Sequence, residues 1–107
     1  MTGFNTQLVH GLPVDDNNTG AVNPPIYNST TYAFERVDAM PRYDYARSGN
    51  PTRDFLEQQI AQLEQGTRGF AFASGLAAIH AVLSIFKPGD RIVVGDNIYG
   101  GSYSQLN

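Results

Sequence analysis

The sequence predicts an α/β fold that forms the first part of a larger protein. Two short apolar runs of β-like composition, 69–73 and 91–95, flank a helix-like run at 75–86. That helix is apolar on most of its faces, which is typical of a helix buried in a larger protein. In a chain of 107 residues, the two strands would leave a parallel sheet with open edges and uncovered faces. We therefore expect further chain beyond residue 107 to complete the sheet.

The composition argues against several classes of protein. Hydrophobic residues make up 41% of the chain and charged residues 16%, which suits a folded domain rather than a disordered one. A net charge of −3 offers no overall attraction to nucleic acid or to an anionic membrane. The chain contains no cysteine, so disulfides, thiolate catalysis and cysteine-based metal sites are excluded. We see no secretory signal or membrane span, no metal-ligand pattern, and expect a cytoplasmic protein.

Residues 1–48 are expected to form an extended N-terminal arm. Periodicity is weak from residue 1 to 42, Pro24-Pro25 favours extended backbone, and 43–48 reads as a second extended piece. An arm of this kind buries little against itself, so its aromatic side chains need another surface, in this chain or in a partner. Residues 49–107 are expected to begin the α/β domain.

The first helix of that domain is expected from about Pro51 to Gln65. Asn50 is a favourable N-cap, and proline is favourable at the first helical position. Gly66 is expected to end the helix in a left-handed conformation. The acidic residues of this segment are interpreted as its solvated face: Asp54, Glu57 and Glu64.

Ser74-Gly75 joins the first predicted strand to the apolar helix. The first turn of a helix leaves backbone N–H groups unpaired and carries a partial positive charge. Gly75 has no side chain, so a phosphate could approach the backbone closely. Ligands of such sheets bind at strand ends and in the loops that follow. We therefore expect an anion-binding turn at Ser74-Gly75.

Two further stretches carry chemically useful side chains. Tyr45 and Arg47 are two residues apart on predicted extended backbone, so both point to one side and could donate to a phosphate. Segment 96–102 places Tyr99 beside two glycines, where its ring could stack on a planar group or its hydroxyl could move a proton. Taken alone, Tyr45 and Arg47 are better explained as a surface pair before a helix. An edge-packed tyrosine on a glycine turn explains segment 96–102 at least as well as a functional role does.

Together, three motifs in this order and spacing resemble the Cys/Met-metabolism (transsulfuration) family of pyridoxal-phosphate enzymes. They are Tyr-x-Arg-x-Gly-Asn-Pro-Thr (45–52), Ala-Ser-Gly-x-Ala-Ala (73–78) and Asp-x-x-Tyr-Gly-Gly-Ser (96–102), and the arm at 19–27 is also similar. The family includes cystathionine γ-synthase, cystathionine lyases and homoserine-ester sulfhydrylases. The resemblance implies a fold-type I, aspartate-aminotransferase-like fold. This chain would supply the arm and the first helix, strand, helix and strand of its large domain.

The resemblance also implies how one cofactor is held. Gly75 and Leu76 would give backbone N–H groups to the phosphate of pyridoxal 5'-phosphate, and Ser74 would shape the turn. The family usually has methionine where Leu76 stands, a change that a backbone contact survives. Tyr99 would stack on the pyridine ring and assist proton transfer at the substrate, which makes it the catalytic residue of this stretch.

By the same resemblance, the site is shared between subunits. Tyr45 and Arg47 would bind the phosphate of the neighbouring subunit's cofactor in a homodimer or homotetramer. The implied substrates are small sulfur-containing amino acids. The reading that we favour is a cystathionine β/γ-lyase, which eliminates at a C–S bond. The alternatives within the family are cystathionine γ-synthase and an O-acylhomoserine sulfhydrylase, which carry out γ-replacement.

The lysine that the family needs is not matched. Such enzymes hold the cofactor as a Schiff base to a lysine. Lys87 is the only lysine here, and it lies in a turn at the opposite end of the second predicted strand from Tyr99. In members of the family, three residues lie later in the chain than the stretch matched here. They are the Schiff-base lysine, the aspartate facing the pyridine nitrogen and the substrate-binding arginine. We therefore expect these 107 residues to be inactive by themselves.

Two readings from other classes stay open. A non-catalytic, truncated chain could act only in subunit assembly by offering Tyr45 and Arg47 to a partner, and it would lack the absorption band of the bound cofactor. An ordinary nucleotide-binding α/β domain ranks last, because the glycine spacing around Gly75 lacks the nucleotide-binding patterns.

Overall fold

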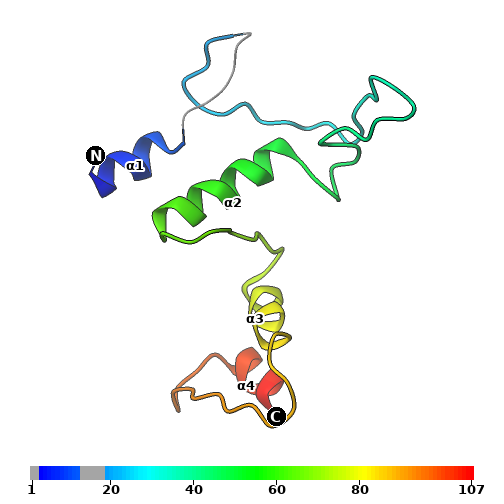
Figure 1. The fold of residues 1–107 in the computed structure, drawn as a ribbon. Helices are drawn as coiled ribbons and strands as arrows, with labels where there is room; N and C mark the ends of the chain where they lie inside the picture. The colour runs from blue at the N-terminus through cyan, green and yellow to red at the C-terminus, as the bar shows by residue number, and fades with distance from the viewer. Residues whose placement is uncertain (1–2, 13–18) are drawn as a thin grey trace. The chain divides into compact units, whose positions relative to one another are not determined.

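The computed structural model describes residues 3–12 and 19–107, which fall into two compact units, Met1–Phe70 and Ala71–Asn107. The described residues form four α-helices: α1 (Phe4–His10), α2 (Pro51–Leu63), α3 (Gly75–Leu83) and α4 (Gly100–Leu106) (Figure 1). None of these helices has the length and hydrophobicity of a membrane span. What was expected of the arm at residues 1–2 and 13–18 lies outside the described residues.

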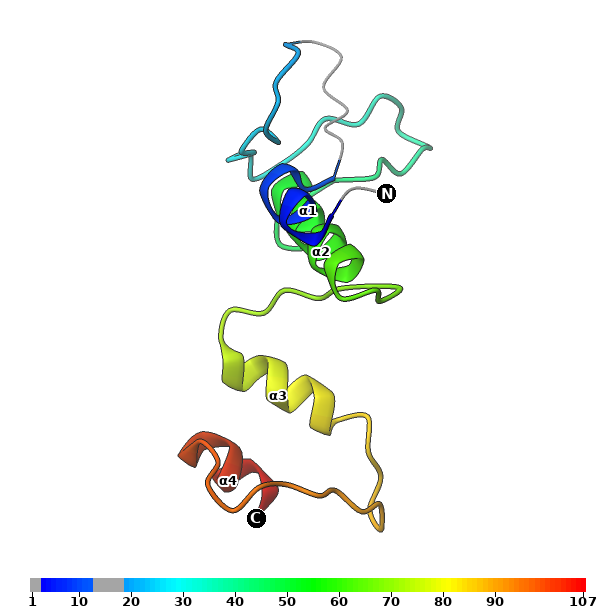
Figure 2. The same ribbon diagram turned by 90° about the vertical axis from the view of Figure 1, so that its left-hand side faces the viewer.

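In the first unit, α1 lies alongside α2, as both ribbon views show (Figures 1 and 2). The expectation of an extended arm was therefore wrong for residues 4–10. The helix forms because it packs on α2 and because Gly11, at φ +60, ends it with a bond from its N–H to the carbonyl of Gln7 at 2.8 Å. Beyond α1, an antiparallel bridge joins Thr31 to Tyr45.

Helix α2 begins as predicted and ends two residues early. The side-chain oxygen of Asn50 accepts a hydrogen bond from the backbone N–H of Thr52 at 2.8 Å. At the other end, Gln65 (φ 55) rather than Gly66 takes the left-handed conformation. The N–H of Gly66 then bonds the carbonyl of Ala61 at 2.8 Å, which makes a Schellman motif. Its left-handed residue comes one position earlier than predicted.

The two predicted strands, 69–73 and 91–95, do not form in the described part of the chain, where the Thr31–Tyr45 bridge is the whole of the β-pairing. The predicted order of helix, strand, helix and strand appears as helices joined by irregular segments. Parallel strands need neighbours along their edges and cover on both faces. Here the side chain of Phe70 is 66% exposed and that of Val93 is 97% exposed, so the faces of the two predicted strands are not covered.

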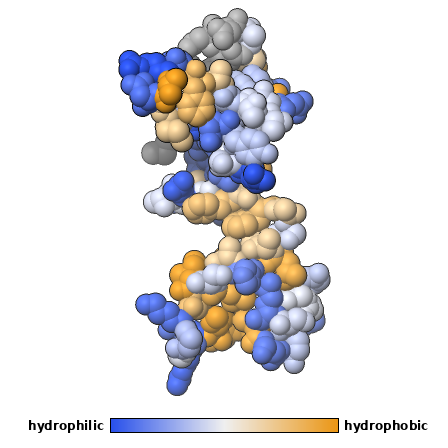
Figure 3. All heavy atoms as spheres, turned by 90° about the vertical axis from the view of Figure 1, so that its right-hand side faces the viewer, coloured by the Kyte–Doolittle hydropathy of each residue, from blue (hydrophilic) through white to orange (hydrophobic). Residues whose placement is uncertain are grey.

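The second unit has little core of its own. Helix α3 contacts α4 and ends at Leu83, three residues before the predicted end. Neither helix contains a buried residue. Large apolar side chains are left exposed in this unit, and hydrophobic surface is prominent in the space-filling view (Figure 3): Phe72, Val82, Ile85, Phe86, Ile92, Val93 and Val94. Burial of α3 in a larger protein therefore stays a prediction.

Candidate functional site

The turn at Ser74 is built by a helix cap. Ser74 has extended backbone (φ −154, ψ 157), and its hydroxyl accepts a hydrogen bond from the N–H of Ala77 at 3.1 Å. In the part of the chain that the structure describes, no acceptor pairs with the N–H groups of Gly75 and Leu76. No acidic residue lies in the first turn of α3. The turn therefore offers two adjacent donors and a partial positive charge to an anion.

Tyr99 and Leu76 meet over the backbone of Gly101. A Cβ atom added to Gly101 would lie 2.6 Å from Cε1 of Tyr99 and 3.1 Å from Cδ1 of Leu76. Tyr99 is the N-cap residue of α4 and is 71% exposed. Its ring therefore sits close to the first turn of α3 and still has an open face.

These features fit a planar ring that carries a phosphate. The unpaired amides of Gly75 and Leu76 suit phosphate oxygens, and the exposed ring of Tyr99 suits stacking on an aromatic group. The backbone of Gly75 is open, because a Cβ atom there would meet nothing within 4 Å. Among the described residues, no three histidine or acidic side chains gather as a metal site would require.

Tyr45 and Arg47 lie together, although the backbone that joins them is a turn. The N–H groups of Ser48 and Gly49 both bond the carbonyl of Tyr45 at 3.0 Å, so the expected extended conformation through residue 48 was wrong. The turn stacks the two side chains: Cζ of Arg47 lies 4.9 Å from the centroid of the Tyr45 ring. Their expected proximity is confirmed.

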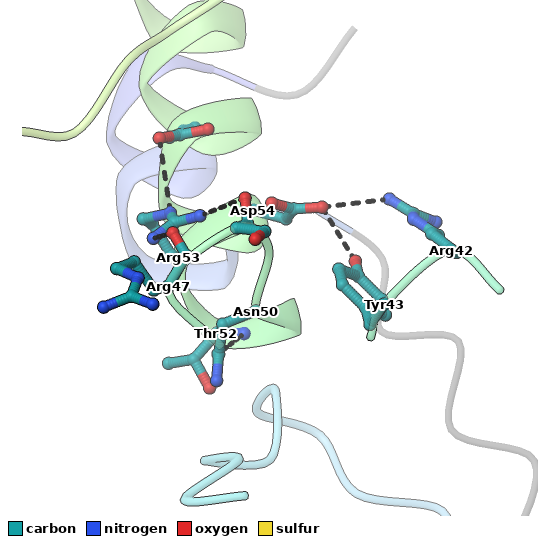
Figure 4. Close-up of polar contacts among 9 residues, drawn as sticks. Arg42, Tyr43, Arg47, Asn50, Thr52, Arg53 and Asp54 are labelled. Atoms are coloured by element: carbon teal, nitrogen blue, oxygen red, sulfur yellow. Dashed lines mark hydrogen bonds and ion pairs between the residues drawn. The ribbon is translucent and has the colours of Figure 1, made fainter. Parts of the chain in front are cut away.

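A cluster around Asp54 was missed. Asp54 was interpreted as a solvated residue, yet its side chain is only 28% exposed and accepts a hydrogen bond from the hydroxyl of Tyr43 at 2.8 Å. Arg42 approaches the same carboxylate at 3.4 Å, and Figure 4 shows both side chains converging on it. Burial of the ring, with the bond to Asp54 and its negative charge, raises the pKa of Tyr43 to about 12. The turn at 46–49 reverses the chain and so brings Tyr43 to Asp54. No rule of sequence spacing links residues 43 and 54, so the contact could not be predicted from the sequence.

A family model described as "Cys/Met metabolism PLP-dependent enzyme" matches residues 5–107. The chain therefore belongs to this family of pyridoxal-phosphate-dependent enzymes. Its similarity to the solved structures is consistent with fold-type I, the coarse fold that the family resemblance implied.

Particular relatives are cystathionine enzymes. The chain is 52% identical over 107 residues to the cystathionine β-lyase of Lactococcus lactis subsp. cremoris (strain MG1363), covering 100% of this chain and 28% of that protein. It is 46% identical over 104 residues to the cystathionine γ-synthase of Haemophilus influenzae, covering 97% of this chain and 28% of that protein. A crystal structure of cystathionine γ-lyase from Lactobacillus plantarum, complexed with L-serine, matches with a TM-score of 0.82 and 46% identity, over 99% of this chain and 28% of that one. The chain thus spans about 28% of the length of these relatives.

Proposed function

We propose that this chain is the N-terminal part of a pyridoxal-phosphate-dependent cystathionine lyase, which breaks a C–S bond in a small sulfur-containing amino acid. The observation that carries the proposal is the pair of unpaired N–H groups on Gly75 and Leu76, behind the Ser74 cap and close to Tyr99. The family match over residues 5–107 and the names of the relatives support the same reading.

The residues of the second unit divide the work between binding and proton transfer. The N–H groups of Gly75 and Leu76 bind the cofactor phosphate, and Ser74 keeps the turn in shape. Tyr99 stacks on the pyridine ring and holds or moves a proton at the substrate. The chemistry that the bound cofactor supplies is stabilisation of negative charge at the α-carbon of the substrate.

Tyr45 and Arg47 act on the neighbouring subunit's cofactor. A phenol and a guanidinium stacked together present a set of donors that suits a phosphate. No ion pair engages Arg47 within the described ranges, so its charge is available to such a ligand. The proposed assembly is a cytoplasmic homodimer or homotetramer of fold-type I subunits.

The lysine that carries the cofactor belongs to the remainder of the protein. Lys87 sits in a turn in which its N–H bonds the Asp90 carboxylate at 2.8 Å, a setting that suits a structural turn residue. These 107 residues alone are therefore proposed to be inactive. Covalent trapping of the cofactor on Lys87 by borohydride would contradict the assignment.

The γ-replacement enzymes remain the second candidate. Similarity to the Haemophilus influenzae γ-synthase, at 46% identity, is close to that for the Lactococcus lactis β-lyase, at 52%. Cystathionine γ-synthase and O-acylhomoserine sulfhydrylase join a thiol to an activated homoserine, whereas a lyase releases a thiol. Assays in the two directions distinguish them.

A chimera tests the proposal. The segment of the Lactococcus lactis β-lyase that aligns with this chain is replaced by this chain, and thiol release from cystathionine is measured. We expect a rate within about tenfold of the parent, equal to about 1.4 kcal/mol of activation free energy. A chimera that folds, assembles and binds pyridoxal phosphate but releases no thiol would contradict the lyase assignment. Thiol consumption with an acylated homoserine would then favour the second candidate.

A further inference from the structure

The first turn of α2 contacts the turn that carries Arg47. The guanidinium of Arg53 donates from Nη2 to the carbonyl oxygen of Ser48 at 2.9 Å and from Nη1 to the carbonyl oxygen of Arg47 at 3.4 Å. Figure 4 shows the Arg53 side chain beside this segment. Because the guanidinium is a planar fork, one side chain can bond two successive carbonyls and fix the peptide between them.

Arg53 is itself held in place. Its Nε lies 3.9 Å from Oε1 of Glu57, one turn further along α2, and its side chain is only 36% exposed. The helix below it is also anchored, because Asn50 caps α2 and its amide donates to the carbonyl of Tyr27 at 3.0 Å. The Arg53 guanidinium, on a fixed turn of α2, can therefore set the position of the backbone at Arg47 and Ser48.

Segment 43–48 is held by hydrogen bonds on both sides of Tyr45. Before it, the hydroxyl of Tyr43 bonds the carboxylate of Asp54 at 2.8 Å. After it, Arg53 bonds the two carbonyls of Arg47 and Ser48. The side chain of Arg47, by contrast, is exposed and contacts the ring of Tyr45. The backbone is thus constrained while the guanidinium that would meet an anion is left open.

We propose that Arg53 is a positioning residue that orients Tyr45 and Arg47 for the phosphate of the partner subunit's cofactor. This inference rests on the proposed function, because it takes from there the phosphate that the two side chains bind. Arg53 acts on the backbone of the turn and does not touch the ligand.

The first test uses the 107-residue chain without cofactor. Nuclear Overhauser contacts between the Arg47 side chain and the Tyr45 ring report their stacking. Arg53→Gln should abolish these contacts while α2 keeps its circular dichroism, because glutamine matches arginine in helix propensity. Arg36→Gln, which changes the same charge at an exposed arginine paired with Asp38, should leave them intact. Stacking that persists in Arg53→Gln would overturn the inference.

The second test measures cofactor affinity in the chimera described above. Arg53→Gln should weaken pyridoxal phosphate binding by about tenfold, the effect of losing charged hydrogen bonds, and leave binding of phosphate-free pyridoxal unchanged. Arg53→Lys, which keeps one charged donor, should recover part of the affinity. Equal weakening for both ligands would show a general structural role and overturn the inference.

Arg47→Gln separates the inference from the function on which it rests. If Arg47→Gln weakens pyridoxal phosphate binding and Arg53→Gln does not, only the positioning role of Arg53 fails. If Arg47→Gln also binds pyridoxal phosphate as the unsubstituted chimera does, the phosphate role proposed for Tyr45 and Arg47 fails with it.

Discussion

The two units hold their functional residues in different ways. In the first unit, the Tyr45–Arg47 turn is fixed by contacts distant in sequence: Tyr43 with Asp54, and Arg53 with the carbonyls of Arg47 and Ser48. In the second unit, the turn at Ser74 is made by its own helix cap, and the large apolar side chains around it stay exposed. In the first unit, contacts between distant segments hold the functional residues in place, whereas in the second unit only the local helix cap does so.

This difference separates what each half of the proposed site requires. The Ser74 cap and the two free N–H groups involve only the first turn of α3, so the proposed phosphate-binding turn needs no sheet beneath it. The stacked Tyr45 and Arg47 require α2, the arm and the turn to be in place together. We therefore expect substitutions in the first unit to cost more stability than substitutions at the Ser74 cap.

The largest effect is expected at Gly69, where a Cβ atom would collide with the backbone carbonyl of Glu57 in α2. Because neither backbone can yield cheaply, Gly69→Ala should lower the free energy of unfolding of the first unit by about 3 kcal/mol, the upper end of the usual range. Urea unfolding followed by circular dichroism measures it. Gly66→Ala, whose Cβ would make only ordinary contacts at 3.7 and 3.8 Å, is the matched control.

Asn50 comes next, because it caps α2 and also holds the arm. Its side-chain oxygen accepts from Thr52, and its amide donates to the carbonyl of Tyr27 at 3.0 Å and to the hydroxyl of Tyr32 at 3.2 Å. Asn50→Ala should cost about 2 kcal/mol, whereas Asn50→Asp should keep the cap and lose only the arm contacts. Equal losses in urea unfolding would mean that the arm contacts contribute all of the stability.

A smaller effect is expected at Ser74. Ser74→Ala removes the acceptor for the N–H of Ala77, so the local opening free energy of α3 should fall by about 1 kcal/mol. Amide hydrogen exchange in α3 would then be about fivefold faster. Ser84→Ala, which removes only a hydroxyl bonded to the carbonyl of His80 in the same helix, should change exchange little. Unchanged exchange in Ser74→Ala would contradict the cap.

The last effect appears only at high pH and concerns Tyr43. The ordinary pKa of a tyrosine is about 10, and in the folded chain burial and the bond to Asp54 raise the pKa of Tyr43 to about 12. The folded state holds the proton more tightly, so this contribution to stability is full below about pH 10 and is lost as the pH rises to about 12. Tyrosinate absorbance follows the titration. Asp54→Asn should lower the Tyr43 pKa. A titration unaffected by that change would contradict the contribution assigned to Asp54.

Local rules predicted the starts of the helices better than the packing between elements. The Asn50 cap and the start of α3 at Gly75 were predicted from residue type and are confirmed, because each needs only its own helix turn. Helix α1 was not predicted, because it depends on packing against α2. The Asp54 cluster was missed for the same reason, since its partner lies 11 residues away across a turn. The two strands were predicted from composition, which cannot supply the neighbours that a parallel strand needs.

The most direct test of the central claim is a crystal structure of the chimera with pyridoxal phosphate bound. We expect phosphate oxygens within hydrogen-bond distance of the N–H groups of Gly75 and Leu76. We also expect the ring of Tyr99 stacked on the pyridine, and Tyr45 and Arg47 of the neighbouring subunit on the same phosphate. A phosphate bound elsewhere, with the first turn of α3 left empty, would contradict the claim.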